Sequence, residues 1–183
     1  NGTLGIGTQA PTYSSDNFGS LVFDGVNDYV DGSKLLPIST TVSLAVWARH
    51  STVPPSTQRY VTLIGEIAVL RHDGANSQGQ LHFYISTSGT LKLNLRVANS
   101  LVANTWYYIV GTWDGTTSRL YKNGVQIGTN VPGGTLDGGN LVYRVSFPTA
   151  GTLESMNGNI SQVSIYNRAL TAEEVSQNFN ATR

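Results

Sequence analysis

The chain has 183 residues, which suits one domain, and its 11 basic and 11 acidic residues balance to a net charge of zero. That balance excludes an electrostatic nucleic-acid binder and a polybasic membrane anchor, and no apolar run approaches the roughly 18–20 residues that span a bilayer. The absence of cysteine excludes disulfides and thiolate metal sites. The 20 glycines indicate a sheet protein with many turns.

The N-terminal segment, residues 1–19, is polar and rich in glycine. We expect it to form an arm, a linker from a preceding domain, or a first short strand followed by a loop. Because the chain begins with Asn rather than Met, we also expect a processed chain or an excised domain.

Alternating apolar and polar residues predict strands along most of the remaining chain. The alternation is clear at 81–85 and at 91–97, where one face of each strand is apolar. Residues 106–113 are apolar on both faces, so we expect a central strand that is covered on both sides. Asn123 and Gly124 can take the positive φ angles of a type I′ turn and predict a tight hairpin. Such closely spaced strands without helices between them indicate a sandwich or a barrel.

One helix of about two turns is predicted near the C-terminus. Thr171 is a good N-cap residue, and Glu174, three residues later, completes a capping box. Leu170 and Val175 are placed to form the hydrophobic staple that accompanies such a cap. We therefore expect a short surface helix with a structural role.

Three sequence blocks together resemble the laminin-G-like, concanavalin A-like jelly-roll domains. They are LVFDGVNDYV at 21–30, WYYIVGTWDG at 106–115 leading to the Asn-Gly hairpin, and GNISQVSIYNRAL at 158–170. The resemblance covers residues 20–183 and implies an all-β fold, a two-sheet antiparallel jelly-roll sandwich with a short C-terminal surface helix. Members of this family bind glycans, proteins or lipids, or act as spacers, so the resemblance does not settle function.

No catalytic residues are expected. Glucanases that share this fold use paired carboxylates in a Glu-x-Asp-x-x-Glu pattern on one strand, and that pattern is absent. Glu66 and Glu154 have no partner carboxylate at the required spacing. His50, His72 and His82 have no paired nucleophile and no metal-ligand spacing. The sequence therefore indicates a protein that binds rather than catalyses.

Calcium is the one metal that the sequence suggests. Asp24, Asn27, Asp28 and Asp31 are crowded into one predicted turn, and hard oxygen donors on a loop suit this ion. Family members often hold calcium. Asp and Asn also form turns by bonding to their own backbone, and that interpretation explains the same residues without a metal.

A candidate carbohydrate-binding surface lies on two adjacent predicted strands. Sugar binding needs aromatic rings for stacking and planar polar groups for the hydroxyls. His82, Tyr84, Lys92, Asn94 and Arg96 are expected to share the solvated face of these strands. Alternating polar residues are also what any solvated sheet face displays.

We therefore expect a non-catalytic carbohydrate-binding or adhesion module of a larger extracellular or virion-surface protein, with calcium as a candidate cofactor. The alternative is a structural decoration domain of a phage or viral particle that binds other protein subunits. A glycan-active enzyme is a distant third hypothesis. A glycan binder should expose an aromatic patch on the concave sheet, whereas a decoration domain should expose apolar surface on its arm or edges.

Overall fold

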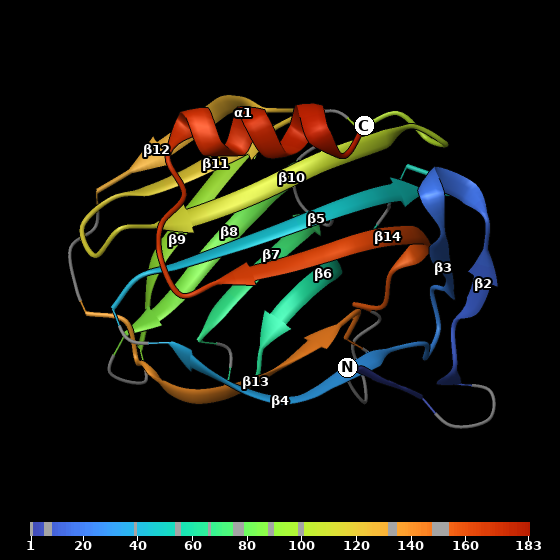
Figure 1. Cartoon of the computed structure of the whole chain (residues 1–183), viewed down its shortest axis with the longest axis horizontal. Coiled ribbons are helices and arrows are strands. Elements are labelled where there is room, and N and C mark those ends of the chain that lie inside the picture. The colour runs from blue at the N-terminus through green and yellow to red at the C-terminus, as the bar shows by residue number, and fades with distance from the viewer. Residues whose placement is uncertain are drawn as a thin grey trace.

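The computed structural model describes residues 2–5, 9–38, 40–53, 56–65, 67–74, 79–87, 90–98, 101–131, 135–147 and 154–183. These residues form two seven-stranded antiparallel sheets and a C-terminal helix, which confirms the predicted sandwich (Figure 1). No helix among them is long and apolar enough to cross a membrane.

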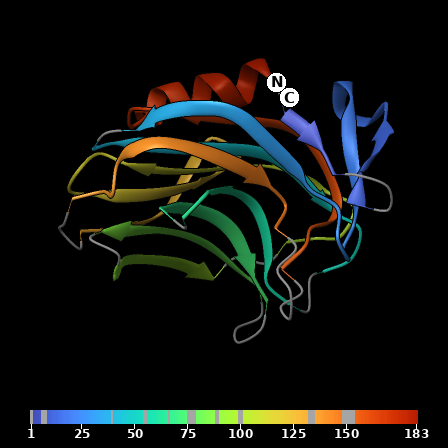
Figure 2. The same cartoon turned by 90° about the horizontal axis from the view of Figure 1, so that it is seen from below.

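Sheet A contains seven strands in spatial order. They are β1 (Gly2–Leu4), β4 (Val30–Ile38), β13 (Gly139–Val145), β6 (Gln58–Leu63), β7 (Ala68–Asp73), β8 (Gln80–Thr87) and β9 (Thr90–Ala98). Figure 2 shows several of these strands as arches whose hollow side faces away from the helix.

Sheet B packs against sheet A and carries the helix on its outer face (Figure 1). Its strands, in spatial order, are β12 (Val125–Asn130), β11 (Ser118–Lys122), β10 (Trp106–Trp113), β5 (Val42–His50), β14 (Asn157–Tyr166), β3 (Ser20–Asp24) and β2 (Thr12–Ser14). A short 3₁₀ turn, η2 (Asp16–Phe18), connects β2 to β3.

The core lies between the two sheets, and β10 is an interior strand of sheet B. All its residues after Trp106 are buried, because one face packs on sheet A and the other lies under the helix. This confirms the central strand predicted from an apolar pattern on both faces. The hairpin that follows also has the predicted turn, since Asn123 and Gly124 have φ angles of 52° and 82°.

Helix α1 (Ala172–Ala181) begins with the predicted capping box, in which Thr171 and Glu174 each accept a hydrogen bond from the other's backbone. Leu170 and Val175 are buried in one cluster with Trp47 on the outer face of sheet B. The helix therefore seals this face of the sandwich.

The segment 1–19 contributes a strand to each sheet. β1 pairs with β4 at the edge of sheet A, and β2 pairs with β3 at the edge of sheet B. The first sequence block, in β3, pairs with the last strand, β14, with Phe23 opposite Gly158. The turn η2 therefore lies at an edge of the sandwich, beside β14.

Candidate functional site

Four polar side chains form one row across the outer face of sheet A. Arg59, Arg71, His82 and Arg96 lie directly opposite one another on β6, β7, β8 and β9. They face away from sheet B, because residues that alternate with them, such as Phe83, pack in the core. Like charges placed directly opposite each other destabilise a sheet, so this row requires counter-charges.

Two carboxylates supply these counter-charges. Asp73 Oδ2 lies 3.5 Å from a terminal nitrogen of Arg71 and 3.5 Å from one of Arg96. Glu154, from the segment before β14, accepts a hydrogen bond from Arg59 and lies 3.7 Å from Arg71. The row is thus a closed network of ion pairs rather than an unpaired cationic surface.

Burial and charge fix the protonation states in this network. Burial is the largest influence on His82 and, with the charges of Arg71 and Arg96, lowers its pKa to about 3. Burial opposes ionisation of Asp73, but the Thr57 hydroxyl and the two guanidinium groups outweigh it and lower the pKa of Asp73. At neutral pH, His82 is therefore uncharged and Asp73 is ionised.

The predicted carbohydrate-binding set is only partly exposed. His82 and Tyr84 are 1% and 4% exposed, so the expectation that they lie on a solvated face was wrong. Their alternation with core residues was correct, but side chains on the neighbouring strands and Glu154 cover this second face. Asn94 and Arg96 are exposed and are hydrogen-bonded to each other at 2.9 Å, whereas the side chain of Lys92 lies outside the described residues.

The predicted calcium cluster is organised by backbone hydrogen bonds. Asp24 Oδ1 accepts from the backbone N–H groups of Val26 and Asn27 at 2.7 and 3.2 Å, and Asp28 Oδ2 accepts from the backbone N–H of Asp24 at 2.9 Å. Burial raises the pKa of Asp28 despite this bond. The loop thus contains the self-bonded turn that the sequence offered as the alternative to a metal.

Asp31, the fourth predicted ligand, is engaged elsewhere. Its two carboxylate oxygens accept a bidentate pair of hydrogen bonds from Arg144, at 2.6 and 2.8 Å. Across the described ranges, no group of three or more His, Asp or Glu side chains is arranged to hold a metal ion. Calcium at this loop therefore stays a prediction.

A site that the sequence did not predict lies at turn η2. The ring of Phe18 is 90% exposed, and Tyr13 nearby on β2 is 75% exposed. Both residues fall in the segment expected to be an arm or a linker. The only sequence signal for such a site is an aromatic residue between turn-forming residues, as in Asp16-Asn17-Phe18-Gly19.

The backbone of this turn is strained and anchored at two points. Asn17 and Phe18 have φ angles of 50° and 61°, which is unusual for a residue as bulky as phenylalanine. The side-chain amide of Asn17 donates to Ser161 Oγ at 2.6 Å, and Asp16 pairs with Arg49 at 2.7 Å. Strained backbone that the surroundings hold in place often occurs at ligand sites, and here it presents the ring to solvent.

A β-bulge in β14 places Ser161 under the turn. Ile160 lies opposite Ala48 and Gln162 opposite Trp47 on β5, so Ser161 has no partner residue on that strand. The pairing of β14 with β3 reaches no further than Ile160. The described chain therefore leaves the edge of β14 open from Ser161 onward, next to the ring of Phe18.

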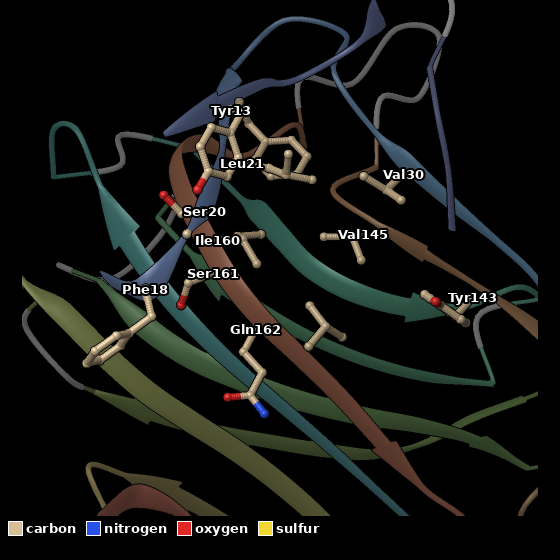
Figure 3. A pocket seen from close by; sticks show the side chains of 13 residues that line it. Tyr13, Phe18, Ser20, Leu21, Val30, Tyr143, Val145, Ile160, Ser161 and Gln162 are labelled. Atoms are coloured by element: carbon tan, nitrogen blue, oxygen red, sulfur yellow. The ribbon is translucent and has the colours of Figure 1, made fainter. Parts of the chain in front are cut away.

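Two hollows flank Phe18 and share Gly19, Ser161 and Gln162. The apolar hollow, about 390 Å³, enters the sandwich edge, and its wall includes Leu21, Phe23, Val30, Val145, Ile160 and Val163 (Figure 3). The mixed hollow, about 380 Å³, is lined by polar side chains that include Asn17, Thr182 and Arg183, together with Trp47. Both volumes fall within the range of small-ligand sites.

Comparisons with known proteins agree with the fold. The family described as the concanavalin A-like lectin/glucanases superfamily matches residues 24–176. The comparison with curated protein sequences gives no match.

Solved structures with this fold include three that cover most of the chain. Domain 4 of AbnA, a GH43 extracellular arabinanase from Geobacillus stearothermophilus, was solved with arabinotriose; it has 17% identity and a TM-score of 0.74 over 93% of this chain and 81% of its own. A heptameric SAP-like pentraxin from Limulus polyphemus has 17% identity and a TM-score of 0.69 over 85% and 78%. The receptor-binding domain of botulinum neurotoxin type G has 12% identity and a TM-score of 0.74 over 99% of this chain but 46% of its own. At these identities the likeness establishes the fold alone.

Proposed function

This chain belongs to the concanavalin A-like lectin/glucanases superfamily, and from that membership and the Phe18 site we propose that it is a non-catalytic carbohydrate-binding module. One observation carries the proposal, namely an aromatic ring that is 90% exposed and held between two hollows. Exposed rings stack on the C–H faces of sugars, because these faces are apolar while the sugar edges are polar.

The groups around the ring suit the polar edges of a sugar. The amide of Gln162 and the hydroxyl of Ser161 lie at the border of both hollows, and Arg183 lines the mixed hollow. Planar amide and guanidinium groups donate in fixed directions, which gives hydroxyl recognition its specificity. The arabinotriose complex of AbnA domain 4 supports a saccharide as the ligand class.

The three glutamates within the described residues support a binding role rather than hydrolysis. Glu154 is engaged by Arg59 and Arg71, and Glu173 and Glu174 lie in the first turn of α1. Retaining glycosidases need two carboxyl groups about 5–5.5 Å apart that are free to act on one bond. We extend the proposal to an adhesion module of a larger extracellular or virion-surface protein.

A glycan array tests this proposal. It should include arabino-oligosaccharides and bacterial, plant and marine polysaccharides, and it should be run with calcium and with a chelator. We expect binding that Phe18→Ala reduces at least tenfold and that Arg96→Ala leaves unchanged. If Arg96→Ala abolishes binding while Phe18→Ala does not, the site is the sequence-predicted surface at Asn94 and Arg96. Loss of binding in the chelator would support the calcium prediction.

A second candidate function has its own observation. Leu4, Tyr13 and Phe18 are 44%, 75% and 90% exposed, and all three lie on the edge segment 1–19. Apolar surface at that place is what we expected of a decoration domain that binds other protein subunits. An array without any binding, together with concentration-dependent association that Phe18→Ala removes, would favour this function.

A further inference from the structure

The apolar hollow is a gap between the two sheets at the edge that carries β2 and β3. Aliphatic side chains from both sheets wall it, with Val30 and Val145 from sheet A and Ile160 and Val163 from sheet B (Figure 3). In Figure 3, Ile160, Ser161 and Gln162 follow one another along β14, with Phe18 on one side and Val145 on the other. An apolar space of this kind is a poor site for water, because water needs two to four polar partners.

The two hollows differ in chemistry but meet at the same wall. Phe18, Gly19, Ser161 and Gln162 line both of them. On one side of this wall the lining is mostly aliphatic and aromatic, whereas on the other side it includes Asn17, Thr182 and Arg183. A ligand that occupies both hollows therefore needs a polar part bonded directly to an apolar part.

We infer that the ligand of the Phe18 site is a saccharide bearing an apolar substituent, an alkyl, acyl or aryl group that enters the apolar hollow. This inference rests on the proposed carbohydrate-binding function and specifies its ligand class. The sugar ring stacks on Phe18 with its hydroxyls toward Gln162 and the mixed hollow. The substituent passes Ser161 and lies among Val30, Val145 and Val163.

The size of the hollow sets the expected effect. At about 390 Å³ it is large enough for a short chain or a single aromatic ring. Each methylene that leaves water for such a lining raises affinity by up to about fourfold. A hexyl group has five methylenes more than a methyl group. A hexyl glycoside should therefore bind at least about tenfold more tightly than the methyl glycoside.

Calorimetry with two matched glycosides tests the inference. Methyl and hexyl glycosides of arabinose, glucose and galactose are titrated into the full chain. In Val163→Phe or Val30→Phe, which fill the hollow from opposite sheets, the affinity for the hexyl glycoside should fall to that for the methyl glycoside. Val125→Phe is the control. It is the same substitution at a residue that is 66% exposed on β12 and does not line the hollow. Thermal unfolding shows which variants remain folded.

The outcomes separate this inference from the function it rests on. Methyl and hexyl glycosides that bind equally well would overturn the inference and leave the carbohydrate-binding function intact. Hexyl glycosides that bind equally well whatever their sugar, while no methyl glycoside binds, would overturn the carbohydrate function and support an apolar-group site. A hexyl advantage that survives both Val163→Phe and Val30→Phe would place the chain elsewhere and overturn the inference. If no glycoside binds, both proposals fail.

Discussion

The Nε–H of Arg71 donates a 2.9 Å hydrogen bond to Nδ1 of His82, directly across the β7–β8 pair. Because Nδ1 accepts this bond, the imidazole is neutral and its proton is on Nε2. A protonated ring would have no acceptor for Arg71 and would add a charge beside two guanidinium groups. The low pKa of His82, about 3, follows from the same burial and charges.

Arg71 should therefore contribute more to stability than its neighbour Arg96. Arg71→Met leaves buried Asp73 and His82 without their shared partner, so we expect the free energy of unfolding to fall by about 3 kcal/mol. Arg96 pairs with the same carboxylate, but its side chain is 39% exposed against 14% for Arg71, so Arg96→Met should lower it by less than about 1 kcal/mol. Urea denaturation of both variants measures the difference, and equal losses would contradict the network described for this face.

The protein should lose stability in mild acid because its three histidines are buried and neutral. Burial is the main cause that lowers the pKa of His50 and His82 to about 3 and that of His72 to about 4, against 6.5 for the unfolded chain. Below pH 6.5 the unfolded chain therefore binds more protons than the folded one. The contribution is complete above pH 6.5 and is lost as the pH falls from 6.5 toward 4 for His72 and toward 3 for His50 and His82.

His72 offers the sharpest test of this pH dependence. Neither of its ring nitrogens has a hydrogen-bond partner in the described part of the chain, and its ring lies 5.5 Å from that of His50. We expect His72→Phe to reduce the slope of unfolding free energy against pH, between 6.5 and 4.5, by about 1.4 kcal/mol per pH unit. Denaturant titrations at several pH values measure it. An unchanged slope would mean that His72 is already protonated in the folded protein.

The fold could be predicted from sequence because its signals are local. The Asn123-Gly124 turn, the Thr171 cap and the apolar strand at 106–113 each depend on residues close together in the chain, and each is present as expected. The resemblance of three blocks then gave the arrangement of these elements.

The site was harder to predict because it depends on distant residues. His82 and Tyr84 alternate correctly with the core, but alternation cannot show that Arg71 and Glu154 cover their face. The position of Phe18 depends on Ser161, 143 residues later in the chain, which anchors the turn through Asn17. No local sequence pattern shows that the bulge at Ser161 contacts a turn so far away in the chain.

Gly111 on β10 should be intolerant of any side chain. A Cβ atom there would lie 2.4 Å from the ring of Phe83 on the opposite sheet, so the glycine permits the sheets to approach at this point. We expect Gly111→Ala to lower the free energy of unfolding by about 1–3 kcal/mol through overpacking. Phe83→Ala removes the ring atoms that a Cβ at Gly111 would meet, so the double variant should lose less than the sum of the two single losses. Additive losses in denaturant titrations would contradict the contact.

Asp24 separates a turn role from a calcium role. Asp24→Asn keeps an oxygen that can accept from the backbone of Val26 and Asn27, whereas Asp24→Ala removes it. We expect Asp24→Ala to lower the free energy of unfolding by about 1 kcal/mol in chelator and Asp24→Asn to lower it much less. If the loop also binds calcium, added calcium should raise the thermal midpoint of the wild type and should not raise that of Asp24→Asn, because the lost charge weakens ion binding. Differential scanning calorimetry in both buffers measures the two effects together. If Asp24→Asn is as unstable in chelator as Asp24→Ala, the turn role is contradicted. The acceptor oxygen that Asn keeps would then make no contribution to stability.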